Sequence, residues 1–206
     1  MQDDTQTGRN PARSAAMKAA LIDAARAIFA EKGYAETGTP EIVRAAGVTR
    51  GALSHHFDGK PGLFRAVLEQ EAEAISRQIQ SAADTGRDAR SALMAGAKGY
   101  FDAMRDPERQ RLMLRDGPAV LGPAGMAEID ARAGRDDLLA GLQALFGPTP
   151  PGTGVQQALA DILSAGFDRM AQHPDRTDAA LAAFDFLFQA ISEATPNAGR
   201  GETLPE

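Results

Sequence analysis

Residues 39–64 read TPEIVRAAGVTRGALSHHFDGKPGLF, and this stretch decides the fold. Its pattern predicts two short helices joined by a tight corner. Ile42 and Val43 mark the inward face of the first helix. Leu53 and Phe57, four residues apart, mark the inward face of the second helix. Two short helices in this arrangement predict a helix-turn-helix unit.

The corner between the two helices is predicted at Ala46, Gly47, Val48 and Thr49. Gly47 accepts the left-handed backbone conformation that a corner of three or four residues needs. Val48 fills the corner. Thr49 is expected to cap the second helix, because its side-chain oxygen can accept a hydrogen bond from a free backbone amide.

The outward face of the second helix carries short or hydrogen-bonding groups: Arg50, Gly51, Ser54 and His55. A short helix that is apolar behind and polar in front suits entry into the major groove of DNA. We therefore expect these four residues to face base edges. Arg50 is the candidate for a contact with guanine, which arginine binds through two hydrogen bonds.

Together with the preceding segment KAALIDAARAIFAEKGYAETG at residues 18–38, this stretch resembles the N-terminal domain of TetR-type transcriptional regulators. The resemblance covers roughly residues 17–68. It is carried by these positions: Ala24, Ala25, Phe29, Gly33, Tyr34, Ile42, Ala46, Gly47, Val48, Gly51, Leu53, Phe57, Lys60 and Leu63. It implies an all-helical homodimer with a separate ligand-binding domain and no catalytic activity, so neither a cofactor nor a bound metal is expected. It also implies DNA phosphate contacts from Thr39, His56 and Lys60.

Two departures from the family pattern keep an alternative open. Ser54 stands where the family usually has a tyrosine, and Gly38 replaces the usual serine or threonine cap. These changes admit a helical dimer whose DNA binding has decayed and which acts as an interaction protein. An enzyme that uses His55, His56 and Asp58 is disfavoured, because adjacent histidines on a helix point about 100° apart and do not converge.

Composition places the chain among ordinary globular proteins. It has 206 residues, 43% hydrophobic content and no cysteine, which excludes disulfides and cysteine-based metal sites. No apolar run reaches the roughly 18 residues of a membrane span, and the polar N-terminus lacks the apolar core of a secretory signal, so a cytoplasmic location is expected. Of the net charge of −6, residues 1–65 carry +2 and residues 66–206 carry −8. This distribution orients the N-terminal part toward phosphates.

Four regions are expected along the chain. Residues 1–13 form a disordered arm, which is either a solvated tail or a means for Arg9 and Arg13 to reach DNA. Residues 14–65 form the DNA-binding domain, and Ser14 caps its first helix. Residues 66–195 form a helical domain for ligand binding and dimerisation. Residues 196–206 form a disordered tail.

Helical spacing within the C-terminal region predicts six helices, at residues 61–82, 88–105, 108–115, 126–146, 155–170 and 177–194. The glycine- and proline-rich segment 116–125 is expected to bend or loop, and segment 147–154 is expected to be a loop. Strand signals are absent.

The resemblance implies a ligand pocket among these helices and a dimer contact through the last two. Core packing is the alternative role for each pocket candidate, and for the dimer the alternative is that both apolar stripes are buried within one subunit. The pocket candidates are Met94, Tyr100, Phe101, Met104, Met113, Arg115, Asp116, Val120, Phe167 and Met170. The dimer candidates are Leu159, Leu163, Phe184, Leu187, Phe188 and Ile191. The predicted function is a repressor that an unidentified small-molecule inducer releases from a palindromic DNA operator.

Overall fold

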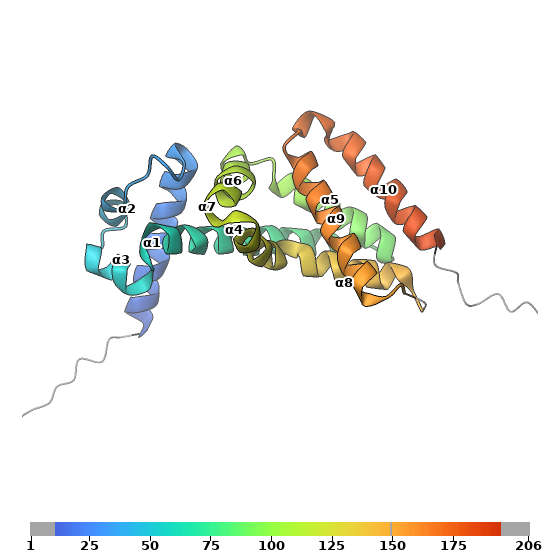
Figure 1. Cartoon of the computed structure of the whole chain (residues 1–206), viewed down its shortest axis with the longest axis horizontal. Coiled ribbons are helices and arrows are strands. Elements are labelled where there is room, and N and C mark those ends of the chain that lie inside the picture. Colours follow the sequence, from blue (N-terminus) through green and yellow to red (C-terminus); the bar gives the residue numbers. More distant parts are fainter. Residues whose placement is uncertain (1–10, 149, 195–206) are drawn as a thin grey trace, which may run out of the picture. The chain divides into compact units, whose positions relative to one another are not determined.

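The computed structural model describes residues 11–148 and 150–194, and every regular element within these ranges is a helix (Figure 1). The predicted all-α fold is therefore confirmed. The chain divides into two compact units, one ending at Leu68 and the other beginning at Glu69. Within the described ranges no helix is both long and apolar enough to cross a membrane. Arg9 and the predicted tail at 196–206 lie outside these ranges.

The first unit holds α1 (Pro11–Lys32), α2 (Thr39–Ala45), α3 (Arg50–His56) and the first turns of α4 (Gly59–Ala83). Helix α1 begins at Pro11, three residues before the expected cap at Ser14, and it packs against both α2 and α3. The apolar side chains between these helices are buried: Leu21, Phe29, Ile42, Leu53, Leu63 and Phe64.

Three aromatic rings join the end of α1 to the start of α4 within this unit. The rings of Phe29 and Phe64 meet edge to face with centroids 5.0 Å apart, and the Tyr34 ring lies 4.8 Å from that of Phe64. Gly33 ends α1 with a φ of 85°. The buried Thr37 hydroxyl donates a hydrogen bond of 2.7 Å to the Gly33 carbonyl, which fixes the turn that brings Tyr34 over the rings.

The helix-turn-helix corner is held by backbone geometry and by one side-chain cap. Gly47 has a φ of 65°, the left-handed conformation that glycine adopts without strain. Thr49 Oγ1 accepts a hydrogen bond of 3.2 Å from the Ala52 amide at the start of α3. Helix α2 lacks such a side-chain cap, because Gly38 stands at its N-terminus, and Pro40 occupies its first turn.

The second unit contains the rest of α4 and a bundle of further helices. Helix α5 packs against α8 and α10, and α9 packs against α8. Three rings from α5, α9 and α10 meet in its core, where Phe167 and Phe184 stack at 3.8 Å and Phe101 lies 5.7 Å from Phe167. The elements after α4 are α5 (Ala89–Ala103), α6 (Pro107–Arg111), η1 (Leu112–Asp116), α7 (Gly117–Asp130), η2 (Ala131–Arg135), α8 (Asp136–Phe146), α9 (Thr153–Ala171), η3 (Pro174–Arg176) and α10 (Thr177–Ala194).

The middle of this unit differs from the sequence prediction in three places. Segment 116–125 is mostly helical, with its bend confined to Gly122 (φ 67°) before Pro123. The helix predicted at 126–146 is interrupted by the π-helical turn η2, where Gly134 has a φ of 116°. The helix predicted at 108–115 changes to π-helical geometry at Leu112. Apolar periodicity alone does not reveal such breaks, because apolar side chains recur on both sides of them.

Helix α5 lies very close to the second-unit part of α4. A Cβ atom added at Gly99 would lie 2.9 Å from Ala82 Cβ and 3.1 Å from the Gln78 carbonyl oxygen. A Cβ atom added at Gly96 would meet Ile79 Cγ2 at an ordinary 3.4 Å. Gly99 therefore sets how closely the two helices approach. A buried ion pair holds α4 on another side, where Arg109 Nε donates to Glu71 Oε2 at 2.7 Å.

We expect Gly99→Ala to lower the free energy of unfolding by about 1–3 kcal/mol, because the added methyl group overpacks the α4–α5 contact. Gly96→Ala is the matched control and should be neutral or stabilising, since its methyl group fits and alanine favours a helix over glycine. Urea unfolding of both variants measures the difference. Equal effects of the two substitutions would show that the contact at Gly99 is not tight.

Candidate functional site

The outer face of α3 carries the four residues expected to face base edges. Arg50, Gly51, Ser54 and His55 are all exposed, while Leu53 on the opposite side is buried. The Ser54 hydroxyl donates a hydrogen bond of 3.4 Å to the Arg50 carbonyl one turn earlier, so its side chain lies along the helix. The structure thus places the four residues together on an exposed face of α3.

The three predicted phosphate contacts differ in their surroundings. Thr39 is the first residue of α2 and is half-buried. Lys60 is held in place, because its Nζ lies 4.2 Å from the centre of the Tyr34 ring and 3.4 Å from the Ala35 carbonyl oxygen. His56 Nε2 is buried and has no hydrogen-bond partner among the described residues. That nitrogen is therefore turned away from solvent in this conformation.

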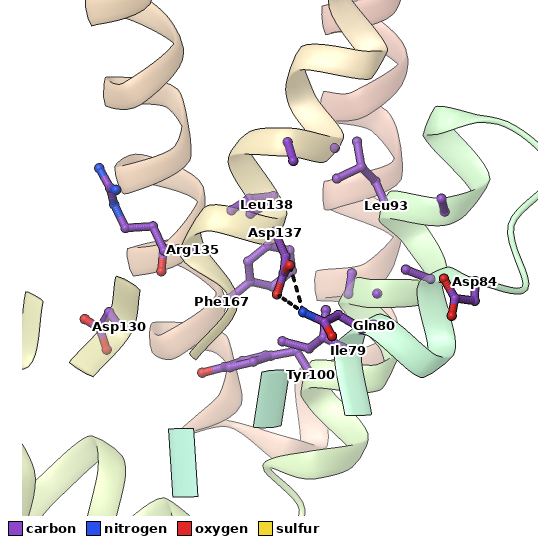
Figure 2. A pocket seen from close by; sticks show the side chains of 18 of the residues that line it. Ile79, Gln80, Asp84, Leu93, Tyr100, Asp130, Arg135, Asp137, Leu138 and Phe167 are labelled. Carbon is purple, nitrogen blue, oxygen red and sulfur yellow. Dashed lines mark hydrogen bonds between the residues drawn. The ribbon is translucent and has the colours of Figure 1, made fainter. Parts of the chain in front are cut away.

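A second candidate site is a pocket of about 250 Å³ within the second unit (Figure 2). It lies among α4, α5, α8 and α9 and the turn η2. Its apolar wall includes Ile79, Leu93, Ala97, Leu138 and Phe167. The mixture of a large apolar wall with a few polar groups is typical of small-molecule sites.

The charged residues that line the pocket are mostly acidic. Asp137 accepts hydrogen bonds from Ser76 Oγ at 2.9 Å and from Gln80 Nε2 at 3.0 and 3.1 Å, and Figure 2 shows the contact with Gln80. Because Ser76 and Gln80 belong to α4 and Asp137 to α8, these hydrogen bonds join α4 to the pocket wall. Asp84, the residue directly after the end of α4, also lines the pocket.

Tyr100, Asp130 and Asp168 form an interacting group at another part of the pocket. The Tyr100 hydroxyl donates a hydrogen bond of 2.5 Å to Asp168 Oδ1. Burial raises the pKa of Asp168, and the hydrogen bond from Tyr100 opposes that rise. Burial, and then the charge of Asp168, raise the pKa of Asp130 to about 6, while Arg135 acts in the opposite direction. Burial and the Asp168 charge also raise the pKa of Tyr100 well above its ordinary value.

Among the described residues, Arg135 is the one basic residue that lines the pocket. Its Nε donates a hydrogen bond of 2.6 Å to Asp161 Oδ1, and its Nη1 lies 3.6 Å from Asp136 Oδ1. Its charge is therefore shared with acidic groups other than Asp130. Across the described residues, no three histidine, aspartate or glutamate side chains are grouped so as to hold a metal ion.

Both units match known protein families. Residues 21–67 match the family of bacterial regulatory proteins called the tetR family, and residues 90–192 match the tetracyclin repressor-like C-terminal domain. The chain belongs to the TetR family. The fold and the sequence resemblance agree with this membership.

Individual TetR-family relatives match over part of their length. The transcriptional activator FasR of Mycolicibacterium smegmatis is 28% identical over 109 residues, which are 53% of this chain and 50% of that protein. The transcriptional repressor Rv1474c of Mycobacterium tuberculosis is 33% identical over 92 residues, which are 45% of this chain and 41% of that protein. This chain spans about half the length of the curated relatives it matches. A crystal structure of a TetR-family regulator from Pectobacterium atrosepticum has a TM-score of 0.67 and 28% identity, covering 93% of this chain and 100% of that one.

Two of the residues predicted to line a ligand pocket, Tyr100 and Phe167, line the pocket of this TetR-family chain. The other eight are not among its lining residues: Met94, Phe101, Met104, Met113, Arg115, Asp116, Val120 and Met170. Phe101, Met104 and Met113 are buried in the packed core instead. Asp116 lies 3.7 Å from Arg111, outside the pocket.

The sequence prediction did not include the acidic residues that line the pocket, which are Asp84, Asp130, Asp137 and Asp168. Asp168 directly follows Phe167 in a helix with an apolar stripe, and Asp130 directly follows the fully buried Ile129. A carboxylate beside an inward-facing apolar residue is a usable signal. It is a weak one, because a turn of 100° along a helix also separates buried positions from exposed ones.

The predicted dimer residues differ in their exposure. Leu163, Phe184 and Phe188 are buried within the chain itself. Leu159 and Ile191 are half-buried. The large apolar side chains exposed on the last two long helices are Val155 (53% exposed), Ile162 (66%), Phe186 (72%) and Leu187 (42%). Leu187 is the one predicted dimer residue that is also among these exposed apolar side chains of the described helices.

We expect Asp130→Asn to raise the free energy of unfolding by about 1–2 kcal/mol at pH 8. Each unit of difference between the folded and unfolded pKa corresponds to about 1.4 kcal/mol, and the expected gain is smaller than the whole difference would give because the carboxylate is only partly buried. The pKa of Asp130 is about 6 when folded, against 3.8 for an exposed aspartate. Folding thus favours its protonated form, and stability is lost as pH rises through that interval. The gain from the substitution should fall to roughly half at pH 5.

Urea unfolding at pH 8 and pH 5 measures this gain. Asp175→Asn is the matched control, because Asp175 is exposed and does not line the pocket. The control should show no gain at either pH. The groups that face Asp130 and also influence its charge are Asp168, Arg135 and Tyr100, and they stay in place in both variants. A gain for Asp130→Asn that is independent of pH would contradict the assigned cause.

Proposed function

We propose that this chain is a ligand-responsive DNA-binding regulator that acts as a repressor of its operator. The observation that carries the proposal is the outer face of α3, where Arg50 and His55 are exposed while Leu53 anchors the helix from behind. A helix presented in this way suits the major groove. The TetR-family membership supports DNA as the partner. FasR is named an activator and Rv1474c a repressor, so the direction of regulation is part of the proposal.

We also propose a homodimer that contacts through α9 and α10. Val155 and Ile162 stand seven residues apart, two turns along α9, and so share one face of that helix. Phe186 and Leu187 supply exposed apolar surface on α10, which packs against α9. Burial of this surface against a second copy would remove it from water. Two copies would present two α3 helices to the half-sites of a palindromic operator.

The proposed inducer site is the pocket of the second unit, and α4 is the proposed transmission element. Helix α4 begins at Gly59, beside the DNA-reading unit in the chain, and continues to Ala83. Its last turns contribute Ile79, Gln80 and Ala83 to the pocket. A ligand that binds better to the DNA-released conformation would shift the population toward that state. Among the described residues, nothing specific favours either the enzyme or the decayed DNA-binding alternative.

The test of this function is binding of the purified protein to DNA that flanks its own gene, compared with random DNA. Arg50→Ala should weaken the flanking site far more than random DNA, by about 1–3 kcal/mol of discrimination if the contact with guanine is bidentate. Lys60→Ala should weaken both DNAs similarly and reduce the log–log salt slope by about one unit.

Lys98→Ala is the control for this experiment, because Lys98 is exposed on α5 in the second unit and should change neither quantity. Fluorescence anisotropy across a salt series measures all three variants. Equal losses on both DNAs for Arg50→Ala would assign Arg50 to phosphate. Absence of any preference of the wild-type protein for flanking DNA would overturn the proposed function.

A substitution at the start of α4 tests transmission. A Cβ atom at Gly62 would meet Asp58 Cβ at 3.4 Å and the Phe57 carbonyl carbon at 3.8 Å, so alanine fits there. Gly62→Ala should stiffen the first turns of α4, since alanine is favoured over glycine in a helix by about 1 kcal/mol. We expect intact operator affinity, intact inducer affinity and a changed ratio between operator affinities measured without and with saturating inducer. An unchanged ratio would exclude this part of α4 as the transmission element.

A further inference from the structure

The pocket of the second unit has a strong imbalance of charge. Four aspartates line it, Asp84, Asp130, Asp137 and Asp168, against the single Arg135. Arg135 is drawn toward Asp161 on α9, which is not a lining residue, with Nε 2.6 Å from Oδ1. The pocket therefore carries a negative charge that its own basic residue does not neutralise. An organic anion entering it would be repelled, and a cation would be attracted.

Two of the aspartates, Asp130 and Asp168, line the same pocket, and the charge of Asp168 acts on Asp130. Asp168 comes from α9 and binds the Tyr100 hydroxyl, while Asp130 comes from the end of α7. Among the described residues, no hydrogen bond reaches the Asp130 carboxylate. Burial, and then the charge of Asp168, disfavour the ionised form of Asp130 and raise its pKa to about 6. A positively charged group placed between them would offset both the repulsion and the cost of burial.

The apolar part of the pocket, independently of its charge, fits an organic ligand rather than a metal ion. Tyr100 and Phe167 line it with ring centroids 5.7 Å apart, and Leu93, Leu138 and Ile79 continue the apolar wall. Figure 2 shows the Tyr100 ring beside this wall, with its hydroxyl directed toward the side on which Asp130 lies. Aromatic faces attract ammonium groups as well as apolar rings. The space of about 250 Å³ admits a small aromatic molecule.

We propose that the inducer of this regulator is an organic cation, an ammonium group joined to an aromatic or other apolar body. The ammonium group would lie between Asp130 and Asp168, and the apolar body would lie against Phe167 and Leu138. That the ligand acts as an inducer rests on the proposed function. The chemical class of the ligand rests on the pocket alone. Asp130 is the positioning residue that selects a cation.

The first measurement compares three probes that share an indole ring and a short side chain. Tryptamine carries an ammonium group, tryptophol a neutral hydroxyl group and indole-3-acetate a carboxylate. Isothermal titration of the full chain at pH 7.5 should give binding at least tenfold tighter for tryptamine than for tryptophol, and none for indole-3-acetate. Equal or tighter binding of the neutral or anionic probe, or absence of tryptamine binding at millimolar concentration, would overturn the proposal.

The second measurement assigns the selectivity to Asp130. Asp130→Asn should weaken tryptamine at least tenfold and leave tryptophol unchanged, while Asp175→Asn, an exposed aspartate outside the pocket, should change neither. Asp130→Asn is expected to fold, since it removes a buried charge. In the wild-type protein, tryptamine affinity should fall about tenfold from pH 7 to pH 5, because Asp130 takes up a proton near pH 6 while the ammonium group stays charged. Asp168, Arg135 and Tyr100 face the same carboxylate and stay in place in Asp130→Asn. Loss of the pH dependence in this variant would therefore assign it to Asp130. A tryptamine affinity that Asp130→Asn leaves intact would overturn it.

DNA binding, measured separately, distinguishes failure of this inference from failure of the proposed function. If the protein prefers its flanking DNA and a neutral or anionic molecule releases it, the proposed function stands and the inference of a cationic inducer is wrong. A protein whose Asp130 selects tryptamine, but which shows no preference for flanking DNA, keeps the cation site and overturns the DNA-binding function.

Discussion

The close approach of α5 to α4 is the contact on which the second unit depends. At Gly99 there is no room for a methyl group, because Ala82 Cβ and the Gln78 carbonyl oxygen lie at 2.9 and 3.1 Å from its position. This separation brings Ile79 and Gln80 of α4 to the same pocket as Leu93 and Tyr100 of α5. A larger residue at the contact would push α4 away from the pocket wall. The small side chain therefore has a consequence for function as well as for packing.

The same pocket holds carboxylates that oppose folding. Burial raises the pKa of both Asp130 and Asp168, which means that keeping them ionised costs stability at neutral pH. Apolar side chains in their place would pack without that cost. Elsewhere in the unit, charge is compensated within the chain, as where Arg109 pairs with the buried Glu71. An uncompensated buried charge beside a cavity is typical of a site that meets its counter-charge in a ligand.

The first unit, which carries the helix-turn-helix, follows a different principle. Helix α3 has only seven residues and would be marginal as an isolated helix in water. It is held by the Thr49 cap, by the left-handed Gly47 and by the buried side chain of Leu53. Arg50, Gly51, Ser54 and His55 lie exposed on the opposite side of the helix from Leu53. The contacts with Tyr34 and Ala35 similarly hold the charge of Lys60 in a defined position within this unit.

The sequence by itself determined the helical class and the helix-turn-helix unit, because these depend on local patterns: apolar spacing, a corner glycine and a capping threonine. It predicted Tyr100 and Phe167 as pocket residues, but within a set of ten candidates of which the other eight do not line the pocket. Only the tertiary structure decided that Leu163, Phe184 and Phe188 turn inward while Ile162 and Phe186 face outward. Helices with apolar residues on two sides do not specify which side meets the core. Only the tertiary structure, likewise, brought Asp130, Asp137 and Asp168 to one pocket, because they come from three different elements, α7, α8 and α9, and apolar spacing does not reveal the break at Gly134 between the first two.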